Sequence, residues 1–226
     1  NETDCTAELT WKLAGENSPR GENQMVYDNG SIRTHDGTGF NGADESITSG
    51  GDTEPGFSLM YSLLEYAADD FILTTETQIN EIEFFAYLNN APLNPNYFEQ
   101  VYVSIYDRSP SEEGAKLLLG DNSTNVYKSA EFANIFRVLE TESHGLVQRP
   151  VFSVKAEIDC KLPAGKYWLM VSLNYNQEVL LGSPYIVPVT ITNQLNTGNA
   201  MYRQPYSADS GWRELVDAGT HSRKGI

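Results

Sequence analysis

The residues best suited to chemistry surround a glycine-rich stretch, "GTGFNG", at residues 37–42. Gly37, Gly39 and Gly42 have the G-x-G-x-x-G spacing of a dinucleotide-binding loop. Such a loop cradles a pyrophosphate only where an apolar strand enters it and a helix leaves it. Here the entry, "GSIRTHD", is polar, and the exit, "ADESITSGGDTEPG", is interrupted by glycine and proline. We therefore predict a surface loop and no nucleotide site.

The same loop is rich in oxygen ligands, and a second acidic stretch, "AADDF", follows it in the chain. Calcium takes six to eight oxygens from carboxylates, amides and carbonyls, and two loops of a sandwich can share one ion. The candidate ligands of a structural calcium are Asp36, Asn41, Asp44, Glu45, Asp69 and Asp70. In the alternative interpretation, each of these side chains caps its own turn by a hydrogen bond to the backbone.

Aromatic residues are the second resource, because a flat ring can stack on the apolar face of a sugar while polar neighbours bind its hydroxyls. Two tyrosines lie opposite the aliphatic face of "QVYVSIYD", and "MYRQPYSADSGW" contains four more candidates. The predicted sugar-binding residues are Tyr102, Tyr106, Tyr202, Arg203, Tyr206 and Trp212. The alternative is that these rings belong to the core, as we expect for Trp11 and Trp168.

Catalytic patterns are not evident. The three histidines, His35, His144 and His221, lie in polar, turn-like stretches without metal-ligand spacing, so we predict that they are surface residues. No G-x-S-x-G is present. A glycosidase needs only two suitably spaced carboxylates, which 31 acidic residues do not exclude. We predict a protein that is not an enzyme and retain a polysaccharide hydrolase or lyase as the third alternative.

The composition excludes two classes of partner. The 226 residues carry a formal net charge of −16, which would repel a phosphate backbone, so we expect no nucleic-acid binding. The longest apolar runs, such as "YWLMV", fall far short of the roughly 20 residues of a transmembrane helix, so we expect no membrane insertion.

The two cysteines, Cys5 and Cys160, are far apart and form no C-x-x-C motif. We predict a disulfide between them, which would indicate an oxidising compartment, with two separate buried thiols as the alternative. The chain begins at Asn1 without an initiator methionine, which favours a processed form.

Apolar and polar residues alternate with the period of a β-strand in most of the chain. The clearest stretches are "TAELTWKL", "INEIEFFAYL", "QVYVSIYD", "VFSVKAEI" and "KYWLMVSLN". About ten or eleven short strands separated by turns, without a long helical stripe, predict an all-β fold: an antiparallel two-sheet sandwich, jelly-roll-like. We expect residues 25–226 to form a single β-sandwich domain and residues 1–24 an N-terminal extension strand.

Several motifs in this order resemble a family of secreted or cell-surface bacterial β-sandwich domains of the Bacteroidota type. The most specific are "YDNG" at 27–30, "GADES" at 42–46, "ADDF" at 68–71 and "LPAGKYW" at 162–168. The resemblance covers about residue 25 to the end and implies export and a jelly-roll-like fold, but no particular reaction. Members of the family typically continue with one more short strand beyond the point at which this chain stops, so either the ending has been cut or the sandwich has an open edge.

These observations predict an exported, non-catalytic β-sandwich that acts in assembly or adhesion outside the cell or at its surface, after passage through the periplasm. In one version it is a filament or surface-layer subunit that associates with itself by strand exchange, since the N-terminal strand of one copy could fill the open edge of another. The strand that would be exchanged carries Ala7, Leu9, Trp11 and Leu13 on one face. The alternative version is a carbohydrate-binding module with a cell-surface glycan as its partner.

Overall fold

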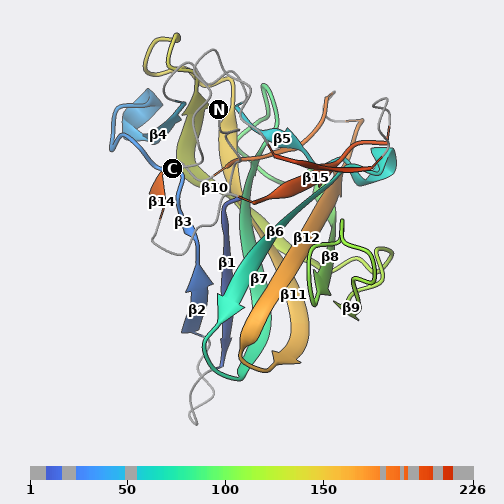
Figure 1. The fold of residues 1–226 in the computed structure, drawn as a ribbon. Coiled ribbons are helices and arrows are strands. Elements are labelled where there is room, and N and C mark those ends of the chain that lie inside the picture. The colour runs from blue at the N-terminus through green and yellow to red at the C-terminus, as the bar shows by residue number, and fades with distance from the viewer. Residues whose placement is uncertain are drawn as a thin grey trace, which may run out of the picture.

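The fold is all-β, as the alternation predicts, and its strands form two facing sheets (Figure 1). A computed structural model describes residues 9–16, 24–48, 55–178, 182–188, 191–192, 199–205 and 211–215. This part of the chain contains no α-helix, only short 3-10 turns at Phe40–Gly42 and Tyr61–Leu63. It therefore includes no helix that is long and apolar enough to cross a membrane.

One sheet has eight strands. Its main path runs β2 (Gln24–Asp28), β1 (Trp11–Glu16), β7 (Thr77–Tyr87), β11 (Pro150–Leu162), β10 (Tyr127–Val138) and β4 (Asp44–Ile47), and β13 (Tyr185–Ile186) and β5 (Phe57–Ser58) extend it beside β7. The sheet is mixed, because β4 pairs in parallel with β10 whereas the other neighbours are antiparallel.

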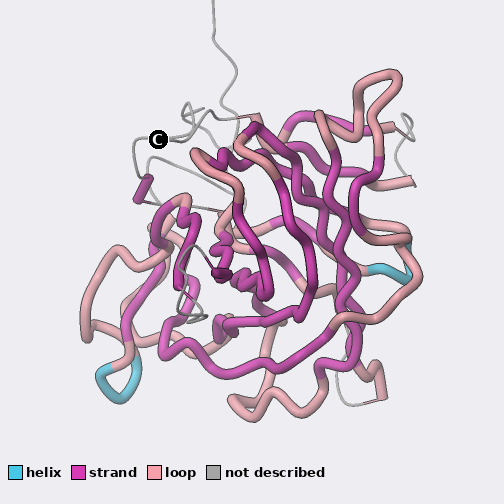
Figure 2. The backbone as a smooth tube through the Cα atoms, turned by 90° about the horizontal axis from the view of Figure 1, so that it is seen from below, coloured by secondary structure: helices cyan, strands magenta, loops and turns pink. Residues whose placement is uncertain are grey.

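The other sheet has six strands and is antiparallel throughout. Its order is β16 (Trp212–Glu214), β15 (Met201–Arg203), β6 (Tyr66–Leu73), β12 (Gly165–Tyr175), β8 (Phe98–Tyr106) and β9 (Leu117–Leu119). A separate ribbon pairs β3 (Gly30–Ser31) with β14 (Ile191–Thr192). Seen from below, the strands curve around a common interior (Figure 2).

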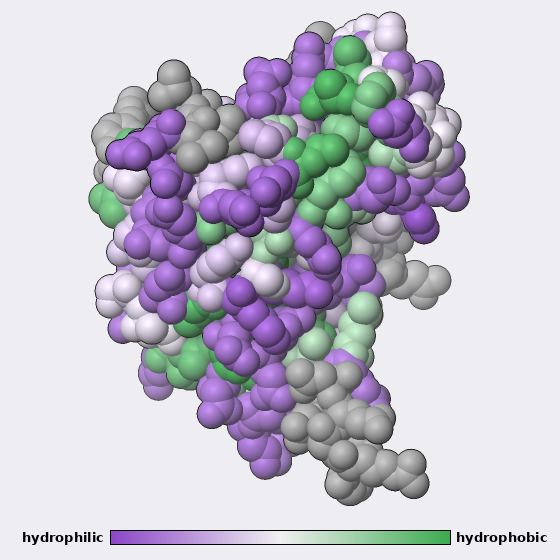
Figure 3. Space-filling model, turned by 180° about the vertical axis from the view of Figure 1, so that it is seen from behind, coloured by the Kyte–Doolittle hydropathy of each residue, from purple (hydrophilic) through white to green (hydrophobic). Residues whose placement is uncertain are grey.

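The core lies between the two sheets, and the predicted inward faces are confirmed. Ile82, Phe84 and Ala86 of β7 are fully buried there, together with the alternating aliphatic residues of β8, β11 and β12. The reason is geometric: successive side chains of a strand point to opposite faces, so a period of two selects one face for burial. The view from behind shows largely hydrophilic side chains, with apolar ones confined to smaller areas (Figure 3).

The strand β1 is an internal strand of its own sandwich. It pairs with β7 on one side and with β2 on the other. Leu9, Trp11 and Leu13 are fully buried in the core; Ala7 lies outside the described residues. The N-terminal strand is therefore part of the sheet of the same chain.

Candidate functional site

The six-stranded sheet carries a layer of aromatic residues on the face that points away from the core. Strand register defines this layer: Trp168 lies opposite Tyr106, while Arg203 lies between Tyr66 and Trp212. Side chains directly opposite each other in a sheet point to the same side. We call this layer the aromatic face; it consists of Tyr61, Tyr66, Ala68, Tyr102, Tyr106, Trp168, Met170, Met201, Arg203 and Trp212.

Tyr61 covers part of the aromatic face from the 3-10 turn that precedes β6. Its ring stacks on Tyr102, with centroids 3.7 Å apart and planes inclined by 21°. It meets Tyr66 edge-on at 6.4 Å. Its hydroxyl donates a hydrogen bond to the carbonyl oxygen of Asn122 at 2.6 Å, and the Asn122 side chain accepts one from Ser104 of β8, also at 2.6 Å. The stacking contact and the hydrogen bond of the hydroxyl together hold the Tyr61 ring in place.

The rings of the aromatic face differ in accessibility. Tyr66, Tyr102 and Trp168 are only 6–7% exposed. Tyr61 and Tyr106 are partly exposed, and so is Trp212 at the far edge of the sheet. The accessible rings therefore rest on a buried aromatic layer, which fixes their orientation.

Polar groups border these rings. Asp70 pairs with Lys166 and accepts a hydrogen bond from the Asn199 side chain at 2.7 Å. Burial raises the pKa of Tyr66, and the neighbouring Arg203 guanidinium opposes that shift. Arg203 forms no ion pair within the described part of the chain. Its guanidinium is therefore a donor group beside the rings, and no carboxylate of the described residues is bound to it.

The structure brings four of the six predicted sugar-binding residues onto this face: Tyr102, Tyr106, Arg203 and Trp212. Tyr202 is not among them. It precedes Arg203 on β15, so its side chain points to the opposite, inward face, and its ring packs against that of Phe57 with the centroids 6.3 Å apart. Tyr206 lies outside the described residues.

Sequence reasoning missed three of the rings on the aromatic face: those of Tyr61, Tyr66 and Trp168. The expectation of a core position is confirmed for Trp11 but only half correct for Trp168, which is buried on the outer face and not between the sheets. A signal was present for Trp168: in the alternating stretch "KYWLMVSLN", Tyr167, Leu169, Val171 and Leu173 share one face, so Trp168 must point to the other. Nothing in the sequence pattern places Tyr61.

The carboxylates of the acidic loop have partners close by in the chain. Asp36 and Asp44 both contact Arg33 at 3.2 Å, and Asp44 also accepts the backbone N–H of Gly37 at 2.8 Å. Asn41 is exposed, with a φ of 54° in its 3-10 turn. These contacts match the alternative interpretation, in which the polar side chains hold their own loop.

The second half of the predicted calcium site lies on the other sheet. Asp69 and Asp70 belong to β6, whereas Asp44 and Glu45 belong to β4. Asp69 accepts hydrogen bonds from the backbone N–H groups of Leu9 and Asp70, each at 2.8 Å. Among the described residues, no group of three or more His, Cys, Asp or Glu side chains is placed to hold a metal ion. The two halves of the predicted site therefore lie on strands of different sheets, and calcium binding stays a prediction.

Glu45 has a different role, which the sequence did not indicate. Its carboxylate is fully buried and accepts hydrogen bonds from Thr38 at 2.6 Å, from the backbone N–H of Gly145 at 2.8 Å and from His144 at 2.5 Å. The exposed rings of His144 and His35 meet edge-on at 5.7 Å. Glu45 thus joins the loop before β4 to the loop after β10. His35 and His144 are surface residues as expected; His221 lies outside the described residues.

Cys160 has a free, buried thiol, so the predicted disulfide is not present; Cys5 lies outside the described residues. Cys160 occupies an inward position of β11, as do Ile158 and Leu162, so its thiol packs among the side chains of the core.

Comparisons of this chain with protein-family models, with curated proteins and with solved structures find no match. The function is therefore inferred from the geometry of the aromatic face and from the chemistry of its residues.

Proposed function

We propose that the protein is a non-catalytic, exported β-sandwich that binds carbohydrate through the aromatic face and acts in adhesion at the cell surface or outside the cell. One observation carries the proposal: three partly exposed rings, those of Tyr61, Tyr106 and Trp212, share one face of a single sheet with the guanidinium of Arg203, which has no ion pair among the described residues. Rings of this kind stack on sugar faces, and a guanidinium donates several hydrogen bonds to hydroxyl oxygens.

The width of the aromatic face favours an extended glycan over a single sugar. Trp212 lies on β16 and Tyr106 on β8, with β15, β6 and β12 between them. Four strand spacings separate the two rings by about 19 Å across the sheet, and the register also offsets Tyr106 along the strands from the row of Trp212. Arg203 lies next to Trp212 in the register, so its donor groups are at the Trp212 end of this span. An oligosaccharide lying obliquely across the strands would contact both ends.

The rigid support of the rings also favours binding. Tyr102 is locked beneath Tyr61, and Trp168 is buried beside Tyr106. Rings that are fixed before the ligand arrives lose little conformational entropy on binding.

Strand exchange between copies is the competing version, and the structure gives it less support. Leu9, Trp11 and Leu13 are fully buried in the core of the same chain, and β1 is hydrogen-bonded on both sides. Donation of this strand to a neighbour would first break both ladders and expose those three side chains. A filament built in this way would form large oligomers, which sedimentation velocity over a dilution series would detect; adhesion through glycan binding predicts a monomer throughout.

Export is supported by the composition, which is low in lysine, and by the resemblance to secreted bacterial β-sandwich domains. An extracellular position would place the aromatic face in contact with cell-surface or environmental polysaccharides. We therefore assign a glycan as the partner of this face.

A glycan array followed by titration calorimetry tests the proposal. We expect Tyr106→Ala and Trp212→Ala each to weaken binding of the best glycan about tenfold, the equivalent of losing roughly 1.4 kcal/mol of stacking. Phe40→Ala is the matched control, because Phe40 is an exposed ring on the distant loop before β4. An array without any bound glycan, or two variants that bind as tightly as the control, would overturn the proposal.

A further inference from the structure

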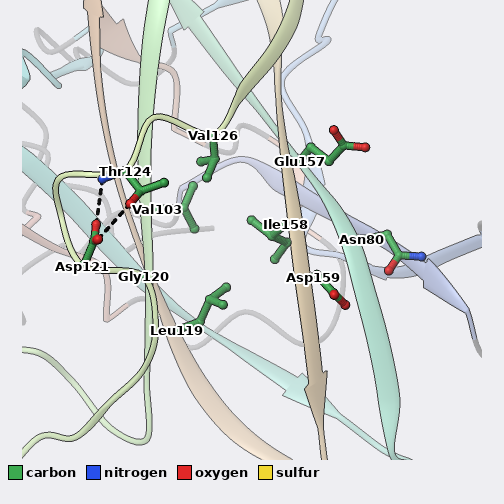
Figure 4. A pocket seen from close by; sticks show the side chains of 10 residues that line it. All are labelled: Asn80, Val103, Leu119, Gly120, Asp121, Thr124, Val126, Glu157, Ile158 and Asp159. Atoms are coloured by element: carbon green, nitrogen blue, oxygen red, sulfur yellow. Dashed lines mark hydrogen bonds between the residues drawn. The ribbon is translucent and has the colours of Figure 1, made fainter.

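A second site lies at the side of the sandwich, on the core-facing side of β8 that carries Val103 and not on the aromatic face. It is a pocket of about 880 Å³ between β8 and β9 on one side and β11 on the other. Figure 4 shows the aliphatic side chains of Val103, Leu119, Val126 and Ile158 pointing into the same space. A volume of this size is within the usual range of ligand pockets. The pocket therefore offers apolar surface at a place where the core opens.

The rim of this pocket includes an open strand edge. β10 pairs with β11 only as far as Ala156, which is opposite Tyr127, and the backbone N–H of Glu157 then donates to the carbonyl oxygen of Val126. β11 continues to Leu162 with β7 as its partner on the other side, and its register shifts by one residue between Glu157 and Cys160. In the described part of the chain, residues 158–162 thus have no strand partner on the side facing the pocket. Such an edge presents backbone donors and acceptors to another chain.

The charge beside this edge is negative. Glu157 and Asp159 are exposed and lie on the opposite side of β11 from Ile158 (Figure 4). Asp159 accepts a hydrogen bond from the neutral amide of Gln78 at 2.8 Å. The two nearby cations are paired with other carboxylates: Lys128 with Glu81 at 2.7 Å, and Lys161, on the same outward face of β11 as Asp159, with Glu76 at 2.5 Å. The outer side of the edge therefore retains acidic groups that are not matched one for one by cations.

We propose that the free edge of β11 at residues 158–162 binds an extended peptide segment of a partner protein in which apolar residues alternate with lysine or arginine. In an added strand, successive side chains point to opposite faces. One set would enter the aliphatic pocket beside Ile158 and Leu119, and the other set would meet Glu157 and Asp159. A second copy of this chain fits poorly, because its net charge of −16 is repelled by the same carboxylates.

Binding of a model peptide to the full chain tests this site. The probe is an end-capped octapeptide of alternating valine and lysine, measured by fluorescence anisotropy. Two control peptides carry glutamate in place of lysine, or N-methyl groups on the backbone amides that would pair with the edge. We expect the probe to bind, both controls to bind at least about tenfold more weakly, and added salt to weaken binding of the probe.

Two double variants of the protein locate the binding. The variant with Glu157→Lys and Asp159→Lys should bind the probe at least about tenfold more weakly than the wild type. The control variant with Glu113→Lys and Glu140→Lys changes two exposed residues outside the pocket and should bind the probe more tightly than the first variant. Backbone amide shifts on binding should be centred on residues 157–162 and 119–126. Absence of binding, equal binding of the N-methylated peptide, equal affinity of the two variants, or shifts centred elsewhere would each overturn the proposal.

Discussion

The backbone N–H of Leu9 donates a hydrogen bond of 2.8 Å to the carboxylate of Asp69, across sixty residues of sequence and from one sheet to the other. Both residues are fully buried. A buried N–H needs an acceptor, and Asp69 supplies one at the point where the chain enters β1. A side chain expected to bind calcium thus anchors the N-terminal strand to the opposite sheet.

Replacement of this anchor should destabilise the fold. Asp69→Ala leaves the Leu9 N–H buried without this acceptor, and we expect the free energy of unfolding to fall by about 2 to 3 kcal/mol. Asp69→Asn retains an acceptor oxygen and should cost less. Urea unfolding followed by circular dichroism measures both, with Asp36→Ala as an exposed control. If Asp69→Ala unfolds like that control, the anchor has no energetic role.

Removal of calcium by a chelator should not change the stability of the fold, because the carboxylates of the acidic loop already have partners within the protein. Asp36 and Asp44 contact Arg33, and Asp44 also binds the Gly37 N–H. An ion bound only by the folded chain would raise the melting temperature by mass action. We expect the same melting temperature in EDTA and in millimolar calcium. A rise with calcium that magnesium does not reproduce would show that the described contacts rearrange around an ion.

The sequence predicted the fold class and the buried faces because both depend on local alternation. Ile82 and Phe84 of β7 illustrate this, since a two-residue period directs both to one face wherever the strand lies in the sheet. The parallel pairing of β4 with β10 was not predictable in this way, because alternation does not specify which strands become neighbours.

The same distinction applies to the candidate site. Tyr102 and Tyr106 were correctly placed opposite the aliphatic residues of their own strand, whereas Tyr202 was assigned to the site from its cluster in the sequence and lies on the other face. The calcium prediction required Asp44 and Asp69 to meet, which depends on the relative position of two strands in different sheets. The sequence therefore allowed us to infer which face of a single strand a side chain occupies, but not which segments distant in the sequence lie next to each other.

The thiol of Cys160 should be present and protected. Burial, together with the nearby charge of Asp159, raises its pKa, and only the thiolate reacts readily. We expect Ellman's reagent to react slowly with Cys160 in the native protein and rapidly after unfolding. A reducing agent should leave the melting temperature unchanged. Detection of two thiols in the unfolded, unreduced chain is the expected result; detection of none would establish a disulfide.

Glu45 should make stability depend on pH in the acid range. Burial raises its pKa, but the hydrogen bonds from His144, Thr38 and Gly145 outweigh burial and hold the pKa below its ordinary value of 4.5. A carboxylate whose pKa is lower in the folded state stabilises the fold fully above its unfolded pKa, and this stabilisation is lost as the pH falls through the folded pKa. We therefore expect the free energy of unfolding of the wild type to fall as the pH drops below about 4.5.

Glu45→Gln should remove part of this dependence of the unfolding free energy on pH and lower the stability at neutral pH. Glu113→Gln, at an exposed position, should leave both unchanged. Equal slopes for the wild type and Glu45→Gln between pH 3 and pH 6 would mean that other carboxylates carry the acid sensitivity.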